Sequence, residues 1–136
     1  MTGDMPQHLR PVLIVDGANV VGSVPDGWWR DRRGAAERLR DRLAEVARRG
    51  IREEPGPLDV VLVVEGRARG VEPSAEVRVA AADGSGDDLI VELAREAAGR
   101  RCVVVTADRE LRSRVNEHGA RCVGPRAVRE DWTTAP

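Results

Sequence analysis

Five acidic residues stand at the ends of apolar segments, where a folded chain would bring their side chains together. Asp16, Glu65 and Asp108 each follow a run dominated by Val, Leu or Ile, which is typical of a strand buried on both faces. Asp87 and Asp88 open a segment with the apolar period of a helix. Because the carboxyl ends of parallel strands meet at one edge of an α/β sheet, we expect these carboxylates to converge there.

A cluster of carboxylates at one edge of the sheet needs a cation to be stable and to take part in catalysis. Like charges repel one another, and a hard divalent ion with oxygen ligands relieves that repulsion, so we predict a Mg²⁺ or Mn²⁺ site. An ion of this kind can activate a water for attack at phosphorus. For any single acid a helix cap or a turn is the simpler interpretation, and the recurrence of the pattern is what favours a metal. The predicted metal ligands are Asp16, Glu65, Asp87, Asp88 and Asp108.

The elements that must position these acids alternate between strands and helices. Such alternation predicts an α/β fold, a single three-layer Rossmann-like domain with a central, mainly parallel sheet. We expect the domain to span residues 11–128, between a flexible N-terminal tail at 1–10 and a C-terminal tail at 129–136. The expected strands are 12–16, 60–64, 76–80, 102–106 and 121–123, and the expected helices are 34–49, a segment opened by the acidic turn 83–88 and closed by Gly99, and a segment ending near His118.

Composition restricts the function further. The 136 residues suffice for one core, and a net charge of −1 excludes a global basic field that would hold nucleic acid non-specifically. No stretch is apolar enough for a membrane span and the first ten residues lack a signal layout, so we predict a cytoplasmic protein with no membrane partner. Cys102 and Cys122 lack metal-site spacing and are expected to be reduced core residues.

Four segments, in order along the chain, resemble motifs of one family. Residues 16–22 (DGANVVG) resemble the opening motif of the YacP-like NYN domains, a branch of the PIN-like nucleases. Residues 86–90 (GDDLI) resemble their Ala-Asp-x-x-Ile helix start, and residues 103–108 (VVVTAD) resemble their strand ending in Thr-x-Asp. Gly119-Ala120 is similar to their helix–strand turn. The resemblance covers about residues 11–124.

The resemblance implies a Rossmann-like sheet and a Mg²⁺- or Mn²⁺-dependent ribonuclease that cuts single-stranded RNA, either free or on the ribosome. Two features depart from the family pattern. Glu65 follows Val64 where the family commonly has Phe-Asp, and Asp88 competes with Asp87 for the same motif position. By motif match, the implied catalytic residues are three metal-binding acids and an amide that orients substrate or a metal-bound water, namely Asp16, Asp87, Asp108 and Asn19.

Five further residues are candidates for contacts with the substrate. Arg67 and Arg69 follow the second strand and could grip phosphates, although a solvated surface loop explains them equally well. Trp28 and Trp29 could stack on an unpaired base, but with so few aromatic residues we expect core packing of at least one of them. Arg109 would contact substrate or only balance carboxylate charge.

Two other functional classes remain open from the sequence. One is a catalytically inactive PIN-like module that binds RNA or a protein partner, which the retained acids disfavour. The other is a Toprim-like phosphotransfer domain, suggested by Val63-Val64-Glu65-Gly66, but the later strand lacks the first aspartate of the Asp-x-Asp pair that such domains carry.

Overall fold

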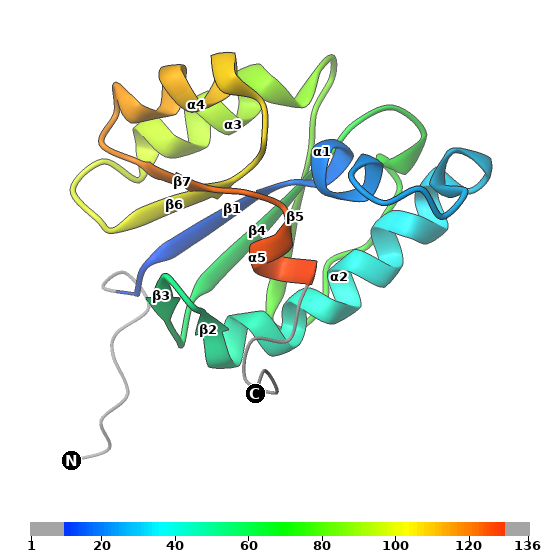
Figure 1. The fold of residues 1–136 in the computed structure, drawn as a ribbon, viewed down its shortest axis with the longest axis horizontal. Helices are drawn as coiled ribbons and strands as arrows, with labels where there is room; N and C mark the ends of the chain where they lie inside the picture. The colour runs from blue at the N-terminus through cyan, green and yellow to red at the C-terminus, as the bar shows by residue number, and fades with distance from the viewer. Residues whose placement is uncertain (1–9, 130–136) are drawn as a thin grey trace.

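Five parallel strands form the central sheet of the computed structural model, which describes residues 10–129 (Figure 1). The strand order is β5-β4-β1-β6-β7, so β1 lies in the middle of the sheet. Each strand begins and ends within one residue of the sequence prediction, because runs of β-branched residues suit strands buried on both faces. The strands are β1 (Val12–Asp16), β4 (Asp59–Val64), β5 (Val77–Ala81), β6 (Cys102–Val105) and β7 (Arg121–Val123).

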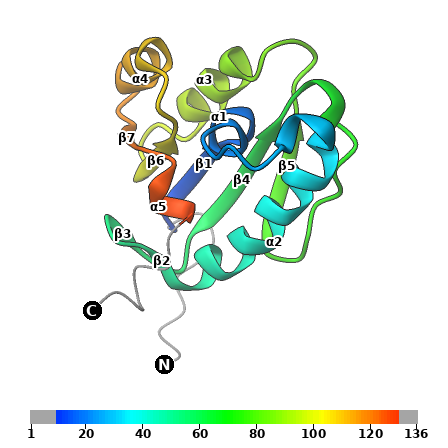
Figure 2. The ribbon, with the colours of Figure 1, turned by 45° about the vertical axis from the view of Figure 1, so that its right-hand side comes forward.

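Helices cover both faces of the sheet, which makes three layers (Figures 1 and 2). Successive side chains of β1 alternate between the two layers: Leu13 packs in the core under α1, α2 and α5, and Ile14 packs in the core under α3 and α4. The predicted three-layer Rossmann-like α/β fold is therefore confirmed. The helices are α1 (Gly17–Gly22), α2 (Arg32–Arg49), α3 (Gly86–Glu96), α4 (Arg109–Asn116) and α5 (Arg126–Arg129).

Several short elements differ from the sequence prediction. The segment after β1, predicted as a loop, begins with α1, and a predicted connector contains the antiparallel pair β2 (Gly50–Ile51) and β3 (Glu54–Pro55). Two 3-10 helices, η2 (Trp28–Arg30) and η3 (Gly66–Ala68), also fall in predicted loops. Elements this short show too little of a hydrophobic period to be recognised from sequence.

Gly17 is required for a different reason from the one its position suggests. A glycine directly after a strand suggests a sharp turn, but the residue is the first of α1 and its φ is not positive. A Cβ atom here would lie only 2.5 Å from the carbonyl oxygen of Val63 in the neighbouring strand. The absence of a side chain therefore lets α1 start directly against β4, immediately after Asp16.

The two predicted tails lie almost entirely outside the described part of the chain. Of the predicted tails 1–10 and 129–136, only Arg10 and Arg129 belong to the described residues. Both cysteines are free, Cys102 is buried, and burial raises the pKa of its thiol to about 11, as befits a small core residue. None of the helices in residues 10–129 has the length and apolarity needed to cross a bilayer.

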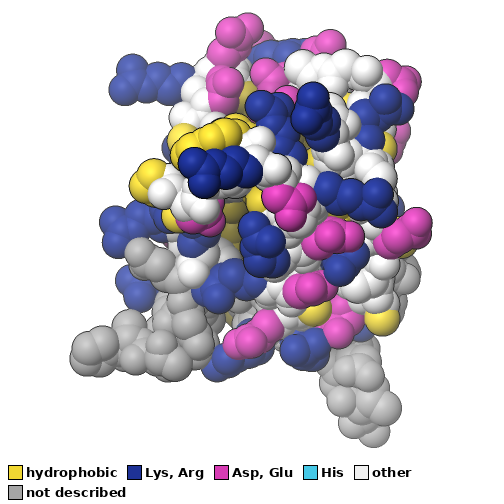
Figure 3. Space-filling model, turned by 90° about the vertical axis from the view of Figure 1, so that its right-hand side faces the viewer, with side chains coloured by type: hydrophobic (Ala, Val, Ile, Leu, Met, Phe, Trp, Pro, Cys, Tyr) yellow, Lys and Arg dark blue, Asp and Glu magenta, His cyan; other side chains and the backbone are white. Residues whose placement is uncertain are grey.

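Charges of both signs are mixed on the surface seen from the right-hand side of Figure 1 (Figure 3). Ion pairs made by α2 contribute to this mixture, including Arg33–Glu37 within the helix and Arg48–Glu76 across to the start of β5. This face is therefore not a single-sign field, in agreement with the net charge of −1.

Candidate functional site

Asp16 lies at the carboxyl end of the central strand and is 6% exposed. Its Oδ2 accepts a hydrogen bond from the Thr106 hydroxyl at 2.9 Å, and its Oδ1 accepts one from the Asn19 amide at 3.3 Å, which caps α1. Burial raises the pKa of the Asp16 carboxyl, the two hydrogen bonds oppose that rise, and the nearby charges of Asp87 and Glu65 add to it. The carboxylate is thus fixed in place and carries an unfavourable charge.

Thr106 joins the end of β1 to the end of β6. It is fully buried, and its Oγ1 both donates to Asp16 and accepts the backbone N–H of Asp108 at 3.2 Å. Asp108 in turn caps α4, because its Oδ1 accepts the Leu111 N–H at 3.0 Å. One buried hydroxyl therefore sets the relative position of two predicted metal ligands. Sequence analysis did not assign Thr106 a role, although it is the Thr of the Thr-x-Asp motif.

Glu65 holds the start of α3 at the same edge of the sheet. Its Oε2 accepts the backbone N–H of Gly86, and a Cβ atom on that glycine would lie 2.9 Å from the same oxygen. Asp87 follows immediately, in the first turn of α3. Desolvation raises the pKa of Asp87, the charges of Asp108 and Glu65 raise it further, and Arg114 opposes them. Four predicted acids therefore influence one another at one edge, as the sequence predicts.

Asp88 takes a different direction from its neighbour. Its side chain is 86% exposed and forms an ion pair with Arg114 of α4 at 2.9 Å. Its charge raises the pKa of Asp87 less than the charges of Asp108 and Glu65 do. The ion pair with Arg114 therefore holds Asp88 at the surface. Asp87 is the one of the two that the charges of Asp108 and Glu65 influence.

Arginine compensates the acids at this edge only in part, through the charge of Arg114 near Asp87. Among residues 10–129, no Lys, Arg or His lies within ion-pair distance of Asp16, Glu65, Asp87 or Asp108. Within the same residues, no three His, Cys, Asp or Glu side chains stand close enough together to hold a metal ion. The donor set fits a hard divalent cation, since it consists of carboxylates that raise one another's pKa, but such an ion would have to draw the side chains together.

Asn19 connects α1 to the loop after β6. Its Oδ1 accepts the backbone N–H of Ala107 at 2.9 Å, while its own backbone N–H donates to Asp16. The carboxamide oxygen is therefore used to hold the edge together. Its predicted role in orienting substrate or water stays a prediction.

The two tryptophans border this edge but do not pack in the core. Trp29 is 53% exposed and Trp28 is half-buried, so the expectation that at least one would be a core residue is wrong. The two rings meet edge to face, with centroids 6.2 Å apart, and the Arg32 guanidinium lies 5.3 Å from the Trp28 ring. Aliphatic side chains, mainly of Val, Leu, Ile and Ala, fill the core on both faces of the sheet without them. Trp28 instead lines a pocket of about 180 Å³ that also includes Gly17 and Glu65.

The candidate arginines all lie at the surface. Arg67 is exposed on η3, and Arg109 is exposed at the first position of α4, directly after Asp108. Arg69 forms an ion pair with the exposed Asp83 at 3.4 Å. Arg67 and Arg109 thus flank the acidic edge, whereas Arg69 has a carboxylate partner.

Comparisons with known proteins agree with this arrangement at the level of the fold. No protein-family model matches the chain, and no curated protein matches its sequence. A crystal structure of Rae1 (YacP) from Bacillus subtilis superposes with a TM-score of 0.69 at 20% identity, covering 86% of this chain and 70% of that one. The chain has the YacP fold. A mutant form of YacP superposes over the same shares with a TM-score of 0.64 at 21% identity. The resemblance predicted from the four motifs is thus confirmed for the fold.

Proposed function

We propose that this chain is an endoribonuclease that cuts single-stranded RNA in the cytoplasm with the help of Mg²⁺ or Mn²⁺. The observation that carries the proposal is the uncompensated charge at the carboxyl edge of the sheet. Asp16, Asp87 and Asp108 extend from three different segments, and the first two have raised pKa values for which neighbouring carboxylates are in part responsible. Proteins rarely collect like charges at one place unless a ligand of opposite charge binds there.

Each residue at the edge has a distinct task in this proposal. Asp16, Asp87 and Asp108 would hold the ion, which when bound supplies neutralising charge and an activated water for attack at phosphorus. Thr106 positions Asp16 and Asp108 through its single hydroxyl. Glu65 holds the N-terminus of α3, and with it Asp87, in place. We assign Glu65 to positioning because the family resemblance implies metal binding only for Asp16, Asp87 and Asp108.

The pocket beside Asp16 suits an unpaired nucleobase. Trp28 forms one wall, and Arg32 lies against that ring, so an entering base would find both a stacking surface and a cation. Arg67 and Arg109 are free to contact phosphates on either side of the edge, with Trp29 as a second stacking surface. These features favour a flexible single strand, either free or presented on a ribosome, because a base within a duplex cannot enter a pocket.

A cap-preserving substitution tests the proposal. Asn caps helices about as well as Asp, so Asp108→Asn should keep the bond to Leu111 and the fold while removing one charge. We expect wild-type protein to cut an end-labelled single-stranded RNA in Mg²⁺ or Mn²⁺ and not in EDTA. The variant should be slower by at least ~10²-fold at saturating RNA, about 2.7 kcal/mol of barrier.

Asp31→Asn is the matched control for this test. Asp31 caps α2 through the Gly34 N–H at 2.9 Å, so the substitution changes the same chemical group in the same structural role at a residue outside the acidic cluster. Its rate should equal that of wild type. Equal rates for Asp108→Asn and wild type would show that the site is misassigned.

The alternative is a module that binds RNA or a protein without cutting. It is favoured by the observation that three of the acids already have structural tasks: Asp16 caps α1, Asp108 caps α4, and Glu65 holds α3. Wild-type protein that binds RNA but leaves it intact in Mn²⁺, alone and with ribosomes, would establish this alternative.

A further inference from the structure

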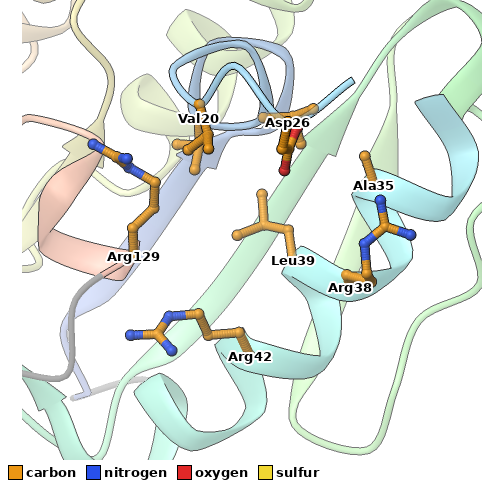
Figure 4. A pocket seen from close by; sticks show the side chains of 9 residues that line it. Val20, Asp26, Ala35, Arg38, Leu39, Arg42 and Arg129 are labelled. Carbon is orange, nitrogen blue, oxygen red and sulfur yellow. The ribbon is translucent and has the colours of Figure 1, made fainter. Parts of the chain in front are cut away.

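A second pocket opens between α1, α2 and α5 (Figure 4), and it shares only Val21 with the lining of the Trp28 pocket. Val20 and Leu39 contribute to its apolar floor. Arg129 of α5 lies on one side of it, and Arg38 and Arg42 of α2 lie on the other side and below. Its volume is about 180 Å³. Pockets for whole drug-sized molecules are larger, roughly 300–1,000 Å³, so this one fits a single group of a larger ligand.

The three guanidinium groups around this pocket have no acidic partner in the part of the chain that the structure describes. Within residues 10–129, no carboxylate lies within ion-pair distance of Arg38, Arg42 or Arg129, whereas other arginines of α2, such as Arg33 and Arg48, do have one. Asp26, the one acid in the lining, is exposed and forms no ion pair with them. The local charge is therefore positive in a protein whose net charge is −1.

Two of these arginines are also partly fixed. Arg42 donates from Nε to the carbonyl oxygen of Val128, which leaves its two terminal nitrogens for another acceptor. The Nε of Arg129 is buried and, among residues 10–129, has no hydrogen-bond partner. A buried donor without an acceptor costs free energy, and an anion bound by the terminal nitrogens of the same guanidinium would offset part of that cost.

We propose that this pocket binds one phosphate group of the RNA strand, away from the bond that is cut. The inference rests on the proposed function. Guanidinium groups match phosphate oxygens with paired hydrogen bonds, and the apolar floor can receive the adjoining ribose. Helix α1 connects the two places: it begins beside Asp16, and Val20 and Val21 near its other end line the pocket. A six-residue helix is about 9 Å long, a distance that a few nucleotides span.

A local anchor of this kind also answers a difficulty with the proposed function. Because the protein lacks a net positive charge, it cannot hold RNA through a general field. Affinity must then come from a few specific contacts, and this pocket offers three arginines in one place. A single strand bound here would continue over α1 to the acidic edge.

RNA binding in EDTA tests the inference without requiring cleavage. The probe is a fluorescent 12-nucleotide single-stranded RNA, titrated at several salt concentrations. Arg38→Glu, at an exposed helix position, should weaken binding by at least ~10-fold, and an Arg38→Ala/Arg129→Ala double variant should lower the slope of log affinity against log salt by about 0.7, the value for one phosphate. Arg52→Ala removes an exposed arginine from the β2–β3 turn and should change neither quantity.

The outcomes separate this inference from the proposed function. If wild type cuts RNA and the double variant shows an unchanged KM and salt slope, the pocket is not an RNA subsite, although the nuclease proposal stands. If the double variant loses RNA binding while wild type never cuts, the subsite stands and the nuclease proposal falls. Wild-type protein that binds no RNA would overturn the inference. So would a glutamate peptide that displaces the RNA at equal concentration, because the pocket would then be a site for acidic peptides.

Discussion

The two ends of the central sheet differ in whether their acidic side chains are paired with arginine. At the amino end, Glu54 is 4% exposed, and its Oε1 receives hydrogen bonds from Arg101 at 2.8 Å and Arg121 at 2.9 Å. Asp59, at the first position of β4, likewise has two arginine side chains within 3.6 Å of its carboxylate. Each acid that the fold needs at this end is thus matched by two cations, which come mostly from the starts of neighbouring strands.

The carboxyl end has acids of comparable burial without that compensation. Asp16 is 6% exposed, yet it receives only a threonine hydroxyl and an amide, and its nearest charged neighbours include Asp87 and Glu65. The chain has 22 basic residues and can therefore pair acids where pairing serves the fold. The proposed binding of a divalent cation at the carboxyl end would account for this contrast.

The largest expected effect is on the rate of RNA cleavage, and it should distinguish the adjacent residues Asp87 and Asp88 at the carboxyl end. Asp87→Asn should reduce RNA cleavage in Mn²⁺ by at least ~10²-fold, about 2.7 kcal/mol, because Asp87 shares its environment with Asp108 and Glu65. Asp88→Asn should change the rate less than about threefold, since it only breaks an exposed pair with Arg114. Single-turnover rates measure both. A larger loss from Asp88→Asn would reverse their assignment.

A divalent ion should stabilise the carboxyl end selectively. At an Mn²⁺ concentration a hundred times its Kd, binding to the folded state alone adds about 2.7 kcal/mol to the free energy of unfolding. Thermal melts should therefore show a higher Tm with Mn²⁺ for wild type and for Asp31→Asn, and a smaller rise for Asp16→Asn. The same rise in all three proteins would remove Asp16 from the metal site.

Removing a charge at the amino end should instead destabilise the fold. Glu54→Gln keeps the size of the side chain but loses its charge-assisted bonds to Arg101 and Arg121, at a cost of about 2 kcal/mol. Glu76→Gln, which weakens an exposed pair with Arg48, should cost less than about 0.5 kcal/mol. Urea unfolding gives both values. A Glu54→Gln protein as stable as wild type would mean that the arginine pairs at the amino end do not stabilise the fold, and that the two ends do not differ in this respect.

The smallest expected effect is a gain in stability, opposite in sign to the loss expected for Glu54→Gln. Without metal, Asp16→Asn should raise the free energy of unfolding, and with it the Tm, because the neutral amide avoids a buried, repelled charge. The raised pKa means that the folded state binds the proton more tightly than the unfolded chain. The stabilisation by protonated Asp16 is therefore complete below the unfolded pKa and is lost as pH rises through the folded pKa.

Melts in EDTA at several pH values check that sign. The advantage of the Asp16→Asn protein over wild type should be absent near pH 3 and should grow as the pH increases to neutrality. An advantage that shrinks with rising pH would mean that the native site stabilises the Asp16 carboxylate, and the contrast between the two ends of the sheet would then be lost.

The sequence by itself determined the elements of the fold and the edge at which the acids gather. Runs such as Val12–Asp16 are local patterns, and a stretch of β-branched residues indicates a buried strand whatever surrounds it. The topology rule for parallel strands then places the residues that follow them on one side, which is why Asp16, Glu65 and Asp108 could be grouped in advance. The same local reasoning identified the Thr-x-Asp motif without finding the task of Thr106.

What only the tertiary structure decided depends on partners distant in sequence. Asp87 and Asp88 are the same residue type at adjacent positions, so the sequence cannot distinguish their roles. The structure distinguishes them because Asp88 pairs with Arg114, 26 positions further along the chain. At least one of Trp28 and Trp29 was expected in the core because aromatic residues are few, but aliphatic side chains fill the core, and Trp28 lines a pocket at the edge. The arginine pocket joins α2 to α5, nearly ninety residues apart, as the Arg42–Val128 bond shows. Such contacts are set by packing in three dimensions, and no periodicity in the sequence carries them.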